Sequence, residues 1–266
     1  MNCEQQAVRL GRGELHGIYY EPPPDTEVSG AAIICDPFAE EKKCAQRTLA
    51  ETARVLAGTG IAALHFDYRG TGDSSGDFVD FGPRQWQEDV QAAIEFVHTQ
   101  LEVSPVGLLG LRLGATLAAQ VAEQNATIAW LVLWEPIIDG QQFVRNSLRR
   151  SLIKAMLTQG GEFSAPQVTN RHQAELIDLD GYQISAPTQA ELAQIDLSGP
   201  KTFSQPVLVV NIAAQAQVTN ETQTLTDSYN RGQAQAVVLE PFWNRIGIID
   251  GEPLLRMTQQ WLQQIV

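Results

Sequence analysis

The chain has 266 residues, and 31 acidic against 18 basic side chains give it a formal charge of −13. This charge and the absence of any Lys/Arg-rich run argue against nucleic-acid and anionic-membrane partners, which require neutralising cations. Hydrophobic residues make up 44% of the chain and charged residues 18%, which predicts a folded domain with a substantial core.

Short apolar runs alternate with amphipathic stretches along the chain. The runs predict strands at residues 14–20, 31–35, 61–66, 106–109, 128–134, 206–212 and 234–239. Apolar residues at three- and four-residue spacing predict helices at 44–57, 85–100, 115–124 and 252–265. This alternation indicates an α/β fold with a mostly parallel central sheet flanked by helices.

Residues 140–200 interrupt the alternation because they contain no strong signal for a buried strand. They carry four cations, which give the segment a basic face within an acidic protein: Arg145, Arg149, Arg150 and Lys154. We therefore predict one core formed by residues 1–139 and 201–266, with a cap or lid insertion at 140–200.

The first residues lack the basic start and apolar stretch of a secretory signal, and no apolar segment reaches the roughly 20 residues that span a bilayer. Cys3, Cys35 and Cys44 are odd in number and match no zinc or redox spacing. We expect a cytoplasmic protein with reduced thiols, and neither a metal nor a cofactor.

A glycine-framed turn stands between a predicted strand and a predicted helix. It reads Gly110-Leu111-Arg112-Leu113-Gly114, with glycines two residues either side of the centre. This is the nucleophile-elbow pattern G-x-S-x-G, in which the central residue is strained and its neighbours pack too tightly for side chains. Here the centre is arginine, so the pattern predicts the steric frame of an elbow without its nucleophile.

A second motif reads Asp67-Tyr-Arg69-Gly-Thr-Gly-Asp-Ser74-Ser75-Gly. It resembles the D-x-R-G-x-G-x-S-x-G loop of α/β-hydrolases, in particular their serine-aminopeptidase-like branch. Together with the elbow and with residues 36–44, 133–140 and 241–243, it makes the chain similar to exosortase-system-associated hydrolase 2. The resemblance implies an α/β-hydrolase fold and a setting in exopolysaccharide production or protein sorting.

The positions of a Ser-His-Asp triad hold other residues. On this fold the nucleophile lies at the elbow, the acid after a late strand and the base after the last strand. Arg112 occupies the elbow, the loop at 213–220 has no carboxylate, and 240–247 has no histidine. The four histidines lie elsewhere, at His16, His65, His98 and His172. We therefore predict that this mechanism is absent.

Substitute nucleophiles are weakly supported by the sequence. Ser74 and Ser75 belong to a glycine-rich loop, where hydroxyls usually hold the backbone, and Asp67 and Arg69 are expected to brace the same loop. Cys35 follows a buried strand without a base nearby, so an inert thiol is expected. Trp130 and Trp134 are predicted to fill the layer between sheet and helix, and His172 to face solvent.

Arg112 allows two interpretations. At a helix start its guanidinium could hold an anionic ligand in the cleft. Alternatively, a nearby loop carboxylate could neutralise it, and this internal pair is favoured because burying an unpaired guanidinium costs several kcal/mol. Trp243 stands at the position of the missing histidine and could close the cleft, but packing in the core is favoured for it. The candidate ligand-binding residues are Arg112, Phe38, Glu40, Glu41, Glu135 and Trp243; Asp36 is a further possible counterion.

The sequence thus predicts a pseudohydrolase with a degenerate elbow at Gly110, Arg112 and Gly114, which binds a small anionic ligand or a partner protein. Two other classes stay open. One is an active esterase, thioesterase or peptidase with a non-standard nucleophile. The other is a structural scaffold or homo-oligomer that uses the cap as its interface.

Overall fold

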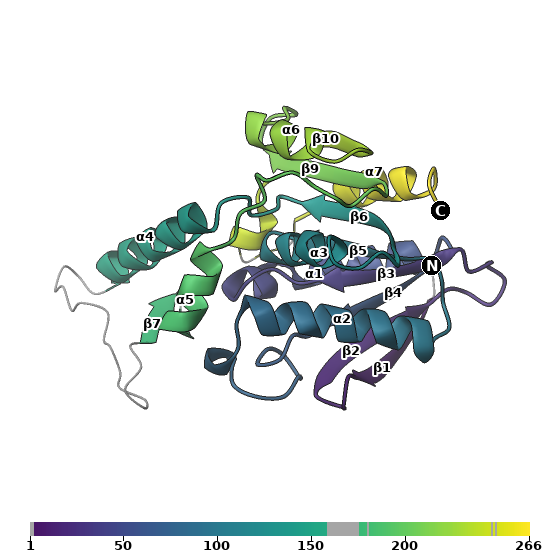
Figure 1. The fold of residues 1–266 in the computed structure, drawn as a ribbon, viewed down its shortest axis with the longest axis horizontal. Coiled ribbons are helices and arrows are strands. Elements are labelled where there is room, and N and C mark those ends of the chain that lie inside the picture. Colours follow the sequence, from purple (N-terminus) through teal and green to yellow (C-terminus); the bar gives the residue numbers. More distant parts are fainter. Residues whose placement is uncertain (1–2, 159–175, 180, 246, 248) are drawn as a thin grey trace.

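The protein is represented by a computed structural model that describes residues 3–158, 176–179, 181–245, 247 and 249–266 (Figure 1). An eight-stranded sheet runs through the core in the order β1-β2-β4-β3-β5-β6-β9-β10. Its strands are β1 (Glu4–Leu10), β2 (Leu15–Glu21), β3 (Gly30–Cys35), β4 (Ile61–Phe66), β5 (Val106–Leu111), β6 (Ile128–Trp134), β9 (Val207–Ala213) and β10 (Gly232–Val238). Only β1 with β2 and β2 with β4 pair antiparallel in this sheet, so the predicted fold class is confirmed.

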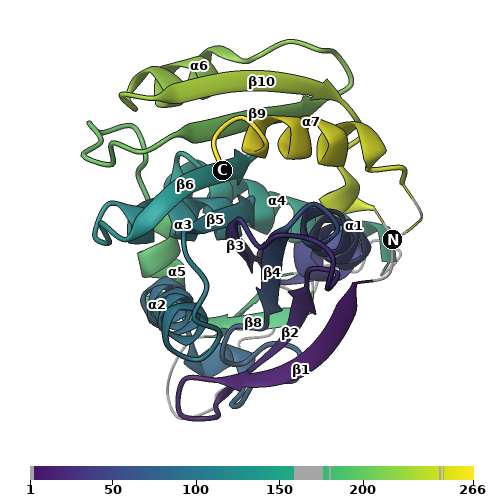
Figure 2. The same ribbon diagram turned by 90° about the vertical axis from the view of Figure 1, so that its right-hand side faces the viewer.

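Helices cover both faces of the sheet (Figure 2). One face packs against α1 (Glu40–Ala57) and α7 (Glu252–Leu262), and the other against α2 (Pro83–Thr99), α3 (Leu113–Ala122) and α6 (Asn220–Asp227). Successive side chains of β3 alternate between these two layers: Ile33 packs in one and Ile34 in the other. The continuous apolar runs in the sequence follow from this burial on both faces.

The segment at 140–200 lies between β6 and β9, which are neighbouring parallel strands of the sheet. Its described part contains α4 (Gly140–Thr158), the antiparallel strands β7 (Leu176–Leu179) and β8 (Tyr182–Ser185), and α5 (Ala186–Ala193). Figure 1 places these elements together at one end of the molecule, beside the carboxyl ends of the central strands. The chain therefore leaves the sheet after β6 and returns to the adjacent position.

Three details differ from the sequence prediction. The predicted opening strand is preceded by β1, and the region between β9 and β10 contains the short helix α6, which the sequence prediction lacked. Helix α1 begins at Glu40, four residues before its predicted start, so the predicted loop at 36–44 is partly helical. Carboxylates at Glu40 and Glu41 in the first turn favour this start through the helix dipole.

The two fully buried tryptophans of β6 fill the layer between the sheet and its helices, as predicted. Trp130 and Trp134 both pack on the side of the sheet that faces α1 and α7. The Nε1 of Trp134 donates to Oγ1 of Thr258 on α7 at 3.2 Å. None of the described helices is both long and apolar enough to span a membrane.

Candidate functional site

The turn between β5 and α3 has the geometry of a nucleophile elbow. Arg112 stands at its apex with φ 56° and ψ −118°, a strained conformation for a residue with a side chain. A Cβ on Gly110 would lie 2.4 Å from the backbone nitrogen of Ala115, and one on Gly114 would lie 2.1 Å from the carbonyl oxygen of Cys35. Both glycines are therefore required by close backbone approach.

The Arg112 guanidinium is enclosed by three groups from separate elements. Its Nε lies 3.5 Å from Oε2 of Glu41 on α1, and its Nη1 donates to the carbonyl oxygen of Glu135 at 3.4 Å. Its Cζ lies 5.5 Å from the centre of the Trp243 ring. The predicted internal ion pair is present with Glu41 as the partner, and Trp243 stacks on the cation instead of supplying a base.

Glu41 has an unusual environment for a carboxylate. Its side chain is only 8% exposed, and within the described part of the chain neither carboxylate oxygen has a hydrogen-bond partner. Burial raises the pKa of Glu41, while the charges of Arg112 and Arg150 oppose that rise. The contact between Glu41 and Arg112 is thus a charge contact at 3.5 Å in which the buried Nε of Arg112 makes no close hydrogen bond.

Glu135 follows β6 in a left-handed conformation with φ 46°. Its Oε1 accepts hydrogen bonds from Nδ2 of Asn211 and from the backbone nitrogen of Ile212, both at 2.5 Å. Oδ1 of Asn211 in turn accepts from the backbone nitrogen of Thr219 at 2.9 Å. This network holds the start of the loop after β9, where a triad would place its acid.

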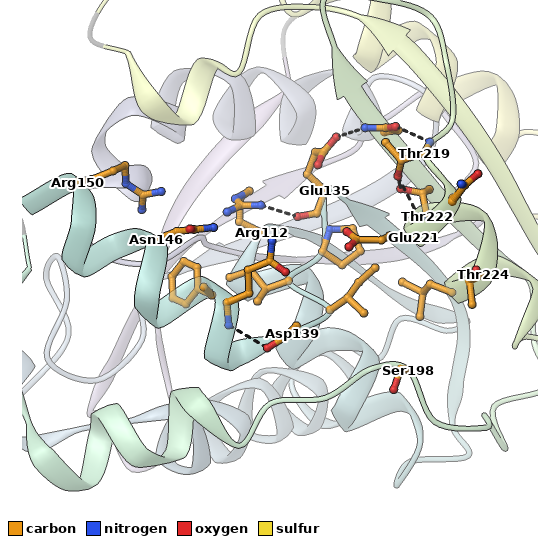
Figure 3. A pocket seen from close by; sticks show the side chains of 18 residues that line it. Arg112, Glu135, Asp139, Asn146, Arg150, Ser198, Thr219, Glu221, Thr222 and Thr224 are labelled. Carbon is orange, nitrogen blue, oxygen red and sulfur yellow. Dashed lines mark hydrogen bonds between the residues drawn. The ribbon is translucent and has the colours of Figure 1, made fainter.

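A cavity of about 530 Å³ opens beside Arg112 at the carboxyl ends of β5, β6 and β9 (Figure 3). Its walls come from the loop after β6, from α4, and from the first turns of α6. Arg112 and Glu135 line it, together with Arg150 of α4. The volume lies within the range of small-molecule sites, and the position is where open α/β sheets bind ligands.

Four predicted site residues are absent from the cavity lining: Phe38, Glu40, Glu41 and Trp243. Glu41 and Trp243 contact Arg112 instead, from α1 and from the segment after β10. Phe38 is buried in an aromatic cluster, with its ring centre 5.6 Å from Phe78 and 5.9 Å from Trp86. Glu40 accepts a hydrogen bond from Nζ of Lys43 at 3.1 Å. Helix α1 accounts for the difference, because it turns Glu41 toward Arg112 and leaves Glu40 on the outer side.

Asp36, the further possible counterion of Arg112, pairs with other residues. It is fully buried, with Nζ of Lys42 at 2.5 Å and Nε2 of His65 at 2.7 Å. These two groups hold the pKa of Asp36 at about 2, although burial acts in the opposite direction. Lys42 also pairs with Asp67 and so joins the loop after β3 to the glycine-rich loop.

The substitute nucleophiles have structural roles. Oγ of Ser74 donates to the carbonyl oxygen of Asp67 at 2.6 Å, and Oγ of Ser75 donates to that of Glu14 at 2.9 Å. Arg69 braces the same loop by donating from Nε to Asp89 at 2.5 Å. Burial raises the pKa of Cys35 to about 12, so its thiolate is inaccessible near neutral pH.

No described histidine lines the cavity. His172 lies outside the described residues. His16, Asp67 and Asp73 bring their possible metal-ligand atoms within 4.8 Å of one another. Because Asp67 already pairs with Lys42, the protein supplies a cation to this group itself.

The predicted site residues do not include the polar residues of α4 that line the cavity. Gln142, Asn146 and Arg150 recur at four-residue spacing and all line the cavity. The signal was available, since residues four apart share one face of a helix. The prediction for this segment rested on its basic residues alone, which indicated a basic face and did not include the neutral amides.

Comparisons with known proteins agree with this geometry. Residues 33–194 match the family described as serine aminopeptidase, S33. The structure resembles the esterase Est1E from Butyrivibrio proteoclasticus with bound ferulic acid, with a TM-score of 0.70, 15% identity, and coverage of 94% of this chain and 95% of that one. It also resembles an esterase domain from Rhodothermus marinus, with a TM-score of 0.64, 19% identity, and 99% of both chains covered. At these identities the likeness establishes the fold alone.

Two curated relatives are themselves uncharacterized. The protein Rv2307c of Mycobacterium tuberculosis is 32% identical over 134 residues, which cover 50% of this chain and 43% of that protein. A 31.7 kDa Escherichia coli protein from the traX-finO intergenic region is 28% identical over 101 residues, or 37% of this chain and 35% of that protein. The matches thus span less than half the length of either relative. The family match covers more than half of this chain, which therefore belongs to the serine aminopeptidase S33 family of α/β-hydrolases.

Proposed function

We propose that this chain is a non-catalytic member of its family, a pseudohydrolase that binds a small anionic ligand beside Arg112. The observation that carries the proposal is the arginine at the apex of the elbow, the point from which a family nucleophile attacks. A guanidinium remains protonated and offers only N–H donors, so it provides no electron pair for attack on a carbonyl.

The positions at which a triad would place its base and its acid support the same conclusion. Trp243 follows the last strand and stacks on Arg112, so an aromatic ring takes the place of a base. After β9, Asn211 and Thr219 hold the loop through neutral hydrogen bonds, and the next carboxylate is Glu221. Ser74, Ser75 and Cys35 are held as described above, so no specific observation favours a non-standard nucleophile.

Positive charge and free donors favour an anion at this site. The Arg112 side chain is 19% exposed, borders the cavity, and has one described hydrogen bond, to the Glu135 carbonyl. Arg150 lines the same cavity and acts electrostatically on the same carboxylate, Glu41. Two guanidiniums share one buried counterion here, so we assign the anionic group of the ligand to them, while the carboxylates of Glu135, Asp139 and Glu221 line other parts of the cavity. The resemblance in the sequence suggests exopolysaccharide production as the setting.

Two measurements on the same samples test the proposal. The first is hydrolysis of p-nitrophenyl butyrate, with labelling by a fluorophosphonate probe. The second is the melting temperature in the presence of inorganic phosphate, acetate or glucuronate. We expect neither hydrolysis above the buffer rate nor labelling, and a rise in melting temperature with at least one anion.

Arg112→Gln should abolish this stabilisation by an anion. The matched control is Arg256→Gln, which removes an exposed arginine of α7 that pairs with Glu252 far from the cavity; it should respond like the wild type. Hydrolysis that the fluorophosphonate blocks would refute the non-catalytic assignment. Equal stabilisation of both variants would refute the role of Arg112.

A further inference from the structure

The wall that α4 contributes to the cavity is polar along its length. Gln142, Asn146 and Arg150 lie on one helix face at four-residue spacing, and all three are exposed. Among the described residues, the side-chain amides of Gln142 and Asn146 have no hydrogen-bond partner, and Arg150 donates only to Oγ of Ser147 at 3.1 Å. This wall therefore presents two amides and a guanidinium to the cavity.

The opposite wall carries hydroxyl groups and a carboxylate. Thr222 and Thr224 of α6 line it, together with Glu221, which lies between these threonines and Arg112 in Figure 3. Glu221 is exposed, and in the described parts of the chain its carboxylate takes part in no hydrogen bond or ion pair. It is therefore available to accept hydrogen bonds from a ligand.

Charge is distributed unevenly along the cavity. Figure 3 shows Arg112 and Arg150 on the same side of the cavity, with Glu135 beside Arg112. Asp139 immediately precedes α4 and accepts a hydrogen bond from the backbone nitrogen of Gln142. It precedes Arg150 by eleven residues, or about 16 Å along the helix axis. A ligand spanning this cavity meets cations at one end, and amides, hydroxyls and carboxylates beyond them.

Building on the proposed function, we propose that the ligand is a polyhydroxylated monoanion, with its acidic group between Arg112 and Arg150 and its hydroxyls between α4 and Glu221. A hydroxyl both donates and accepts, so it matches an amide on one side and a carboxylate on the other. Phe143 and Ile137 add apolar surface for the C–H groups of such a ligand. A simple fatty acid would leave the amides and Glu221 without partners.

Isothermal titration calorimetry with five probes tests this inference on the full chain. Glucuronate and glucose 6-phosphate carry both features and distinguish a carboxylate from a phosphate. Glucose carries hydroxyls alone, and hexanoate and propionate carry the anion alone. We expect at least tenfold tighter binding of glucuronate or glucose 6-phosphate than of the other three, with affinity falling as salt increases.

Variants then show which residues bind the acidic group of the ligand and which bind its hydroxyls. Arg150→Gln should weaken the binding of the preferred probe at least tenfold, whereas Arg149→Gln, an exposed neighbour that does not line the cavity, should leave it unchanged. Glu221→Ala should reduce the ratio of affinities between the preferred probe and hexanoate. All three positions are exposed, so loss of folding should not obscure the comparison.

Each contrary outcome overturns the inference in a distinct way. Equal binding of hexanoate means that hydroxyls are not recognised, and equal binding of glucose means that the anion is not. If no probe binds but another anion stabilises the protein through Arg112, this inference fails and the proposed function stands. Ester hydrolysis would refute the proposed function while leaving the ligand preference to be judged from the titrations.

Discussion

Replacing Arg112 with serine restores the residue that the elbow pattern requires, and we expect it to destabilise the protein without creating an esterase. The Glu41 carboxylate is 8% exposed and loses the guanidinium 3.5 Å away. No described histidine lines the cavity, so among the described residues the new hydroxyl would have no imidazole to accept its proton.

The size of the loss follows from the burial of the pair. Removing one partner of a buried ion pair costs about 3–5 kcal/mol. Arg112 is 19% exposed and its contact with Glu41 is not a hydrogen bond, so the lower end applies. Loss of stacking on Trp243 removes roughly a further 0.5–1 kcal/mol. We expect an overall loss of about 3.5–4 kcal/mol, or roughly 7–16 °C in melting temperature.

A double-mutant cycle with urea unfolding measures this coupling. Arg112→Ser with Glu41→Gln should recover at least about 1 kcal/mol relative to Arg112→Ser alone, since it removes the unpaired charge. Additive losses in the double variant would show that the pair contributes no coupling and would refute the reasoning. Esterase activity in Arg112→Ser would also refute the reasoning, because it would show that the new hydroxyl has a base.

The loss of stability caused by Arg112→Ser should also depend on pH. Burial raises the pKa of Glu41, so the folded state binds this proton more tightly than the unfolded state. Stability from this group is therefore present below the unfolded pKa and is lost as pH rises through the folded pKa. Without Arg112 the folded pKa rises further. The difference between wild type and Arg112→Ser should be large at pH 8 and shrink toward pH 5.

Four further predictions concern Cys35, the Asp36–Lys42 pair and the elbow glycine Gly110. Cys35, whose pKa is raised to about 12, should react with Ellman's reagent only after unfolding. Lys42→Met should cost about 3–5 kcal/mol because it leaves Asp36 buried beside His65 alone. In the wild type, stability from Asp36 should fall as pH drops from its usual pKa toward about 2, measured by acid titration of circular dichroism. Gly110→Ala should lower the yield of folded protein, because its Cβ would meet the backbone of Ala115.

Most of the fold could be predicted because buried parallel strands leave continuous apolar runs. The exceptions have physical causes. β1 is an edge strand whose first four residues are exposed, so its sequence, starting at Glu4, is polar and shows no apolar run. α6 has eight residues, too few for a clear helical period. Both elements are held by the sheet beside them more than by their own sequence pattern.

The candidate site was only partly predictable. The glycines at 110 and 114 identified the elbow, because their spacing reflects close backbone approach. Four carboxylates were possible partners of Arg112, and residue order alone could not separate them. The register of α1 selects Glu41, while Lys42, one residue on, points to Asp36. Such choices depend on the helix start, which is poorly determined by sequence.

A nucleophile elbow has two requirements: a strained backbone geometry, and a nucleophilic side chain at its apex. The elbow of this chain meets the first without the second. Its strained backbone and its flanking glycines depend on how β5, α3 and the end of β3 pack, and nothing in that packing specifies the side chain at the apex. Arg112 can therefore replace a nucleophile without loss of the fold, provided that its charge is compensated. Glu41 and Trp243 supply that compensation from elements that already meet at the cleft. On the proposed function, conversion to a hydrolase would require changes at all of these positions together, which is why a single serine should not suffice.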